Sequence, residues 1–327
     1  MTKTSASPSH TVFGIFMMLG FAAFGPVIDV FAKLAGEAGI PVFQISGARF
    51  AVQVLILIPF ALLYRALHLP DRREAGLYIL RGGLILIATS FFFASLNYLP
   101  IADAISIFFI EPFVLTLLGA ILLGETIGWR RITACLVGFC GALLVIQPQY
   151  AAIGIAAAFP LGTAICFALY LILTRQMTQR AHPLAVQIYT SLAAFMLIMP
   201  VLLLMDNGPI AALDMIPLDM YQLSLLIGVG IAASIAHMFI TVAFRHAPVA
   251  VLAPLQYLEI ISATLFGWWV FSDLPNQTTF LGIIIIVGSG LYVFMRERKV
   301  GKEKPASATG LHSKLPRSNT PPANKSD

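Results

Sequence analysis

Charged residues are scarce in this sequence: Asp, Glu, Lys and Arg together make up 11% of the 327 residues, whereas 59% are hydrophobic. A soluble globular domain carries about 25% charged residues, so the composition excludes a soluble protein with a large core and indicates a membrane protein. The formal net charge of +5 comes mainly from the tail after residue 295, because the charges before it nearly cancel. A Lys/Arg cluster that follows an apolar segment is typical of a cytoplasmic membrane face, so no nucleic-acid partner is expected.

Cysteine and the common catalytic motifs are also nearly absent. The three cysteines, Cys135, Cys140 and Cys166, lie inside apolar runs without CxxC or His-rich spacing, so they predict no disulfide framework and no metal site. We expect them to be small buried hydrophobic residues. The sequence contains no GxxxxGK[ST] and no HExxH motif, which excludes a nucleotide-driven pump encoded in this chain. No cofactor is expected.

Long apolar stretches, in contrast, recur along the whole chain at about the twenty residues that a membrane-spanning helix needs. Lys3 precedes the first stretch as in a signal peptide, but no small-residue cleavage site follows, so we interpret this stretch as a first transmembrane helix. Ten spans are predicted, at residues 12–33, 42–64, 77–97, 102–123, 130–147, 152–174, 184–205, 221–244, 249–271 and 278–295.

The loops between these spans alternate in charge. One side collects Lys3, Arg65, Arg72, Arg73, Arg81, Arg130, Arg131, Arg175, Arg180, Arg245 and the C-terminal tail. The other side collects Glu37, Asp103, Asp206, Asp214, Asp219 and Asp273, with only Lys33 against them. Since positively charged loops stay in the cytoplasm, we expect a multi-pass protein of the bacterial inner membrane with both termini in the cytoplasm.

An internal repeat links the two halves of the chain. At an offset of 148 residues, "YLPIADAISIFFIEPFVLTLLGAILLGE" aligns with "HAPVAVLAPLQYLEIISATLFGWWVFSD", which pairs Pro100 with Pro248 and Glu111 with Glu259. Two units of five spans, residues 12–147 and 152–296, would enter the membrane from opposite sides. This inverted repeat is an architecture in which transporters place a substrate site near the midplane. Residues 1–11 and 297–327 are expected to be cytoplasmic tails, the second one disordered.

The repeat places one acid at the same depth in each half. Glu111 lies roughly 12 Å along its helix at 1.5 Å per residue, near the middle of a hydrocarbon layer about 30 Å thick. An acid there costs about 2.5–3.5 kcal/mol, so it usually faces a cavity or a partner. We therefore predict a substrate site at Glu111 and Glu259; the alternative is that each is a buried, hydrogen-bonded packing residue. Phe108 lies close to Glu111 in the sequence, and Gln256 and Tyr257 lie close to Glu259. Aromatic rings such as those of Phe108 and Tyr257 attract cations.

Other polar residues fall inside the predicted spans. Asp29 either belongs to the site or pairs with Lys33 one turn later. Arg49 is interpreted as a counter-ion to Glu111 or Asp29, or as a ligand for a substrate carboxylate. Candidate site residues on the third and eighth spans are Thr89, Asn97 and His237. His237 either relays protons or serves as a packing donor. Glu125 is expected to form a structural pair with Arg130 or Arg131.

Together these features resemble the drug/metabolite transporter superfamily, EamA type, over about residues 12–296. The resemblance rests on the five-plus-five repeat, on Arg49, on Pro100 and Pro248, and on the "LLGE" that closes the fourth span. It implies an all-α polytopic membrane protein with ten transmembrane helices and a cavity lined by spans 1, 3, 4, 6, 8 and 9. It also implies proton- or exchange-coupled movement of small metabolites. The stretch "ILRGGLILIATSFFFASLNYLPIADA" is similar to a branch that contains S-adenosylmethionine uptake carriers.

The leading hypothesis is a secondary transporter for a small cationic or zwitterionic metabolite, such as an amine, an amino acid or an S-adenosylmethionine-like compound. Asp29, Glu111 and Glu259 outnumber Arg49 within the spans, so an ionised empty site would favour a positive ligand. An exporter of the same fold is one alternative. An intramembrane enzyme is another, although neither the paired catalytic Asp residues nor the Ser/His dyad of such enzymes is visible.

Overall fold

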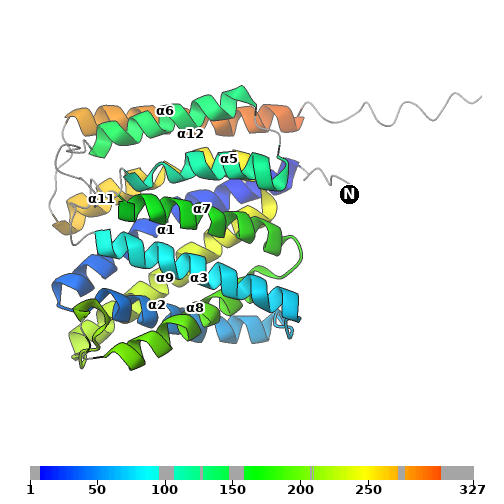
Figure 1. Cartoon of the computed structure of the whole chain (residues 1–327). Coiled ribbons are helices and arrows are strands. Elements are labelled where there is room, and N and C mark those ends of the chain that lie inside the picture. The colour runs from blue at the N-terminus through cyan, green and yellow to red at the C-terminus, as the bar shows by residue number, and fades with distance from the viewer. Residues whose placement is uncertain are drawn as a thin grey trace, which may run out of the picture.

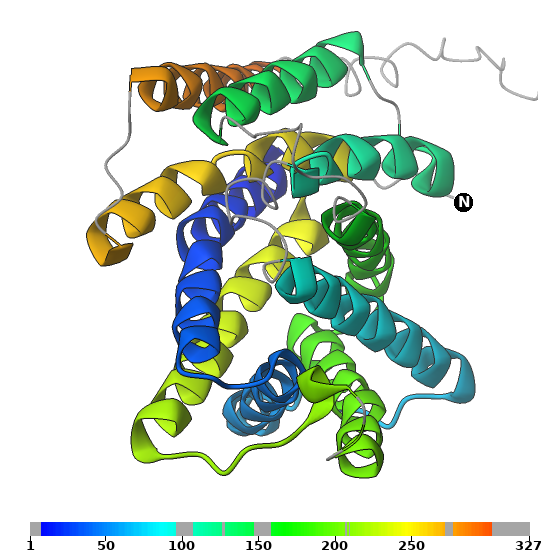
Figure 2. The same cartoon turned by 60° about the vertical axis from the view of Figure 1, so that its left-hand side comes forward.

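The computed structural model describes residues 8–95, 107–125, 128–146, 158–206, 208, 210–271 and 277–302, and every regular element in these ranges is helical. In chain order the helices are α1 (Pro8–Glu37), α2 (Val42–Leu63), α3 (Arg72–Ser95), α5 (Glu111–Leu123), α6 (Trp129–Ile146), α7 (Ala158–Thr178), α8 (Pro183–Met205), the 3-10 helix η3 (Ala211–Leu213), α9 (Met220–His246), α10 (Val249–Gln256), α11 (Glu259–Phe271) and α12 (Gln277–Lys302). They form a bundle in which α6 and α12 lie together as an outer pair (Figures 1 and 2).

Seven helical segments within the described ranges are long and apolar enough to cross a membrane, with α10 and α11 counted as one. Shorter apolar helices occupy Glu111–Leu123, Ile132–Gly141 and Phe280–Ser289, which fall within the remaining predicted spans. The outside of the bundle carries large apolar side chains: Leu55, Trp269 and Leu204 are 69%, 77% and 85% exposed. Large exposed apolar surface on helices of this length fits contact with lipid. The chain is an all-helical, multi-pass membrane protein.

Local sequence signals begin and end the helices where turns are needed. Asp219 starts α9 with a capping box. Its side chain accepts a hydrogen bond from the backbone N–H of Gln222, and its own backbone N–H donates to Gln222 Oε1. His182 caps α8, with Pro183 at the first helical position. Gly124 ends α5 in the left-handed region at φ 63°, where glycine has no Cβ penalty.

Two helices are interrupted at positions related by the sequence repeat. α5 begins at Glu111 and α11 begins at Glu259, both helices have 13 residues, and their starts differ by 148. Both breaks contain tight i→i−3 bonds: Ile110 N to Ile107 O at 3.2 Å in the first, and Leu258 N to Leu255 O at 3.1 Å in the second. Pro112 is the second residue of α5 and lacks the backbone N–H that would continue a helix through the first break. Pro254 lies inside α10, shortly before the second break.

Helix packing follows the same correspondence. The repeat relates α1 to α7, α2 to α8, α3 to α9 and α5 to α11, and contacts occur in matching pairs. The contact of α1 with α9 matches that of α7 with α3, the contact of α1 with α11 matches that of α7 with α5, and the contact of α2 with α9 matches that of α8 with α3. The equivalent helices α2 and α8 also pack on each other. Two glycines at the 148-residue offset allow close approach: a methyl group on Gly82 would meet the Thr190 backbone in α8, and one on Gly230 would meet Val52 in α2. Small residues at such contacts let transmembrane helices approach closely.

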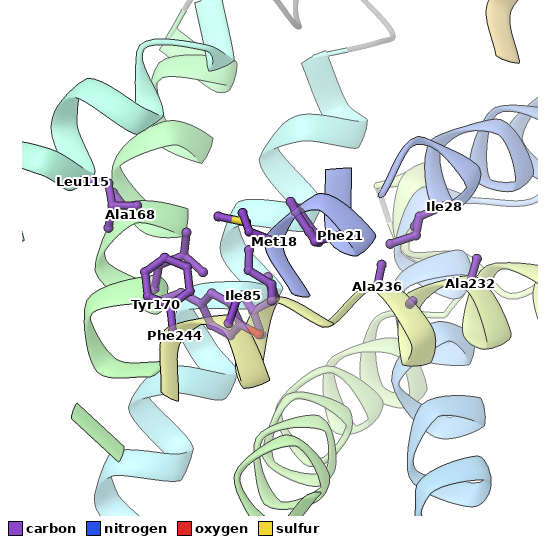
Figure 3. Close-up of a cluster of buried hydrophobic side chains, with 14 of the residues drawn as sticks. Met18, Phe21, Ile28, Ile85, Leu115, Ala168, Tyr170, Ala232, Ala236 and Phe244 are labelled. Atoms are coloured by element: carbon purple, nitrogen blue, oxygen red, sulfur yellow. The ribbon is translucent and has the colours of Figure 1, made fainter. Parts of the chain in front are cut away.

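The main apolar cluster lies between α1, α3, α7, α9 and α10. Met18, Ile85, Tyr170 and Phe244 belong to it and point toward one another from four of these helices (Figure 3). The cysteine prediction is correct only in part: Cys135 is buried, but Cys166 is half-buried and Cys140 is exposed. In a membrane protein an exposed apolar-facing position can contact lipid, so burial in protein is not required for a hydrophobic thiol.

Candidate functional site

A cavity of about 110 Å³ opens between α1, α2, α3, α7, α9, α11 and the residues just before α5. Its polar lining consists of Asp29, Arg49, Thr89, Thr163, His237 and Glu259. Its aromatic lining consists of Phe21, Phe92, Phe93, Phe108, Phe109 and Phe167. These are the helices that the family resemblance implies, with α2 added through Arg49.

Arg49 is the cation of the cavity. It is buried, donates from Nη1 to Thr89 Oγ1 at 2.8 Å, and contacts His237 Nε2 through Nη2 at 2.6 Å. Its guanidinium also lies 5.1 Å from the centre of the Phe50 ring. The Nε–H is buried without a hydrogen-bond partner among the described residues. An unpaired buried donor is costly, so this N–H is available to an anionic group in the cavity.

Asp29 and Glu259 place two carboxyl groups in the same cavity. Glu259 packs directly against α1, because a methyl group on Gly25 would meet its Oε1. Asp29 is within electrostatic range of both Arg49 and Glu259, yet the ion pairs within 4 Å among described residues do not join Arg49 to either acid. Charges of both signs therefore line one cavity without a close ion pair between them among the described residues. Lys33, the alternative partner of Asp29, lies 3.9 Å from Glu37.

Glu111 does not line this cavity, contrary to the prediction of a shared site with Glu259. Its side chain is 1% exposed and its Oε1 has no hydrogen-bond partner among the described residues. It is nevertheless close enough to Glu259 for a Coulombic interaction. Each Glu starts its own half-helix, α5 against α7 and α11 against α1, but of the two acids Glu259 is the one that lines the cavity.

Gln256 and Tyr257 are likewise buried at the second helix break but are absent from the cavity lining. Tyr257 O–H donates to the backbone oxygen of Phe109 at 3.1 Å, and the two rings lie 5.8 Å apart. Since Phe109 and Tyr257 correspond at the 148-residue offset, the two breaks touch each other. Of the other predicted site residues, Asp29, Arg49, Thr89, Phe108 and His237 line the cavity, and Asn97 lies outside the described residues.

Comparison with known proteins gives this cavity a context. The family described as "EamA-like transporter family" matches residues 12–147 and again residues 153–295. The chain belongs to the EamA-like transporter family. The sequence resemblance to that family is thereby confirmed, and transport is the general function that membership supports.

Relatives of this EamA-like protein carry several transporter names. An S-adenosylmethionine uptake transporter of Rickettsia prowazekii is 24% identical over 90% of this chain and 96% of its own length. A riboflavin transporter of Vibrio cholerae is 25% identical over 89% and 95%, and a pseudopaline exporter of Pseudomonas aeruginosa is 26% identical over 80% and 88%. A solved crystal structure superimposes with a TM-score of 0.72 at 18% identity, covering 90% of this chain and 99% of the other, and shows the fold alone.

Arg81 is a residue of this EamA-like transporter that sequence reasoning misplaced. It was grouped with the cytoplasmic loops, but α3 begins at Arg72 and Arg81 is fully buried within it. Its guanidinium donates to Thr174, Thr190, Tyr170, Gln187 and the Val186 carbonyl oxygen. A signal was present, since Arg81 falls inside the predicted span 77–97 and an intramembrane cation indicates a functional residue.

Glu125 also has partners other than those predicted. Its carboxylate accepts from Val249 N at 3.2 Å and Ala250 N at 3.1 Å, and it lies 3.9 Å from Arg175 Nε. It therefore caps α10, where a negative charge interacts favourably with the positive end of the helix dipole. Arg130 and Arg131 follow Glu125 closely in sequence. The backbone N–H groups that Glu125 binds belong to the start of α10, which lies in the second half of the chain.

Proposed function

We propose that this protein is a secondary active transporter that moves a small cationic or zwitterionic metabolite across the bacterial inner membrane by alternating access. The cavity at the level of the helix breaks is the substrate site, and a proton or an exchanged ligand drives the cycle. The observation that carries the proposal is one cavity lined by Arg49 and by two acids, Asp29 and Glu259, with no ion pair within 4 Å between Arg49 and either acid among the described residues.

A zwitterion fits this arrangement better than a simple ion. An anionic end would bind the unpartnered Arg49 Nε–H through a charge-assisted hydrogen bond, while a cationic end would lie against Asp29 and Glu259. The ring of Phe108 and the other aromatic side chains of the lining would add cation–π attraction. Because Asp29 and Glu259 outnumber Arg49, a ligand with a net positive charge would best neutralise the ionised site.

The transport mechanism proposed here uses two inverted halves of five spans each, residues 12–147 and 152–296. The paired helix contacts, the equal 13-residue half-helices and the two family matches support this division. Interrupted helices at the midplane of inverted repeats are the elements around which the halves of transporters rock. In this orientation both termini would lie in the cytoplasm, where the basic loops of the sequence belong.

The test replaces Glu259 by Gln, which removes a cavity charge while keeping the shape of the side chain. In liposomes loaded by exchange, wild-type protein should transport S-adenosylmethionine or another cationic metabolite found by a thermal-shift screen. Glu259→Gln should weaken binding roughly ten-fold or more, because it removes a charge-assisted contact. The matched control is Glu37→Gln, an exposed acid 3.9 Å from Lys33, which should leave binding unchanged. Unchanged affinity of Glu259→Gln would show that this carboxylate is not a ligand contact.

An exporter of the same fold is the second candidate, and the similarity to a pseudopaline exporter favours it. Import and export use the same cavity and the same alternation. Radiolabelled ligand in inside-out and right-side-out vesicles separates them, since only one orientation accumulates it under a given proton gradient.

A further inference from the structure

Four side chains from four helices form a continuous polar chain through the centre of the bundle. Arg81 Nη2 on α3 donates to Tyr170 O–H on α7 at 2.8 Å, Tyr170 O–H lies 3.0 Å from His237 Nδ1 on α9, and His237 Nε2 lies 2.6 Å from Arg49 Nη2 on α2. All four residues are buried. These hydrogen bonds connect Arg81, which does not line the cavity, to Arg49, which does.

The chemistry of arginine fixes the direction of every bond in this chain. Arg has donors only and stays protonated in proteins, so His237 Nε2 must accept from Arg49 and cannot carry a proton. The neutral imidazole then carries its proton on Nδ1, which donates to the Tyr170 oxygen. That oxygen also accepts from Arg81. The contact with Arg49 therefore sets the tautomer of His237, and the Tyr170 oxygen, held in place by Arg81, accepts the Nδ1–H that this tautomer presents.

The position of Tyr170 is itself tightly determined. The Arg81 guanidinium lies 4.2 Å from the centre of the Tyr170 ring and uses its Nε to bind Thr174 Oγ1 at 3.0 Å. Phe167 stacks on the same ring with centroids 5.5 Å apart. Arg81 has five N–H donors, and its five hydrogen bonds go to acceptors on α7 and α8. Arg81 thus serves Tyr170 and its neighbours rather than the cavity.

The consequence falls on Arg49. A long side chain that faces a cavity loses rotamer entropy when it binds a ligand, unless other contacts already hold it in place. His237 and Thr89 each bind one terminal nitrogen of Arg49 beforehand, and Nε is the guanidinium nitrogen without a partner among the described residues. Without a bare His237 Nε2, two N–H groups would face each other at this contact, and Arg49 would have to move.

We propose that Tyr170, held by Arg81, is a positioning residue that keeps His237 in the tautomer that accepts from Arg49, and so orients Arg49 toward the anionic end of a zwitterionic ligand. This inference rests on the proposed function, because it assigns the role of Arg49 within the same cavity. It also assigns a specificity: ligands with a carboxylate depend on Tyr170, whereas amines or sulfonium compounds without one do not.

The first experiment reads the histidine directly and needs no ligand. Full-length protein with ¹⁵N-labelled histidine is measured by NMR in detergent, with His237 assigned from the signals lost in His237→Gln. Wild-type protein should show His237 protonated at Nδ1 and bare at Nε2. Tyr170→Phe, which removes only the hydroxyl, should shift these signals toward the other tautomer. Tyr78→Phe is the matched control, because Tyr78 is a buried tyrosine on α3 that is not one of the four hydrogen-bonded side chains. It should leave the His237 signals unchanged.

The second experiment measures selectivity with S-adenosylmethionine and its decarboxylated analogue as probes. Tyr170→Phe should weaken binding of the first roughly ten-fold, the typical worth of a charged hydrogen bond, and leave binding of the second unchanged. A proton on His237 Nε2 in wild-type protein, or equal weakening for both probes, would overturn the positioning role. Wild-type protein that binds neither probe would count against the proposed function instead, and the ring-nitrogen signals would still decide the role of Tyr170.

Discussion

At the scale of single residues, Glu111 and Glu259 have the same position in the repeat but different surroundings. Glu259 faces the cavity, whereas Glu111 is buried with an unpartnered Oε1. A buried carboxylate oxygen without a partner is expensive when the group is ionised, and a proton on Glu111 lowers that cost. Under the proposed function, Glu259 would contact the ligand and Glu111 would exchange the proton.

Glu111→Gln tests this division. The amide mimics a carboxyl group that never loses its proton, so we expect net transport in liposomes to be abolished. Ligand affinity should stay within about two-fold of wild type, because Glu111 does not line the cavity, and membrane insertion should be intact. The measurements are the dissociation constant and the initial transport rate. If the variant transports at the wild-type rate, the carboxylate is structural.

Residue types and depths could be predicted from the sequence more readily than residue partners. Arg49, Asp29 and His237 were recognised as intramembrane polar groups, and all three line the cavity. The Arg49–His237 contact was not foreseen, because it depends on the register between α2 and α9, 188 residues apart. Arg81 was assigned to a cytoplasmic loop because it lies near the loop arginines in the sequence. In the structure it lies within α3, more than two turns after the helix begins, and is buried.

At the scale of helices, the interruptions before α5 and α11 are the distinctive elements. Pro112 and Pro254 lie near these interruptions in the sequence, but the apolar stretches predict continuous spans at 102–123 and 249–271. A proline predicts a disturbed helix without saying whether the helix kinks or ends. The outcome depends on tertiary contacts such as the Tyr257–Phe109 bond, which joins the two breaks.

Pro254→Ala tests whether the second break is needed for transport. Alanine restores a backbone N–H and favours helix, so the helix should become more continuous and the melting temperature should stay the same or rise. Transport should fall several-fold if the halves rock around this point. Pro59→Ala is the control, since Pro59 lies inside α2 and is exposed on the outside of the bundle. Equal transport by both variants would show that the break has no part in the cycle.

At the scale of the whole molecule, the repeat in the sequence corresponds to a repeat in the packing. The offset of 148 residues relates Gly82 to Gly230, and each allows a close contact with a helix of the other half. The repeat could be predicted from the sequence, because identical residues at one offset mark equivalent positions. The cavity could not be predicted in this way, since it forms where helices of both halves meet. A single half contains neither the Arg49–His237 contact nor the Tyr257–Phe109 contact.

The inverted relation between the halves makes a prediction about loops. Early in each half the offset is 142 residues, which pairs Lys33 with Arg175 and Pro41 with Pro183. At this offset Glu37 in the first half corresponds to Gln179 in the second. Both residues are exposed at helix ends. If the halves are inverted and the termini lie in the cytoplasm, Glu37 faces the outside and Gln179 faces the cytoplasm.

Cysteine labelling can decide this. In a background with Cys135, Cys140 and Cys166 replaced by Ala, Glu37→Cys should react with a membrane-impermeant maleimide on intact cells or spheroplasts. Gln179→Cys should react only after the membrane is permeabilised, and Leu69→Cys, in a loop where Leu69 is 96% exposed, should behave like Gln179→Cys. Labelling of Glu37→Cys and Gln179→Cys from the same side would mean that the two halves run parallel, and the alternating-access scheme built on their inversion would have to be abandoned.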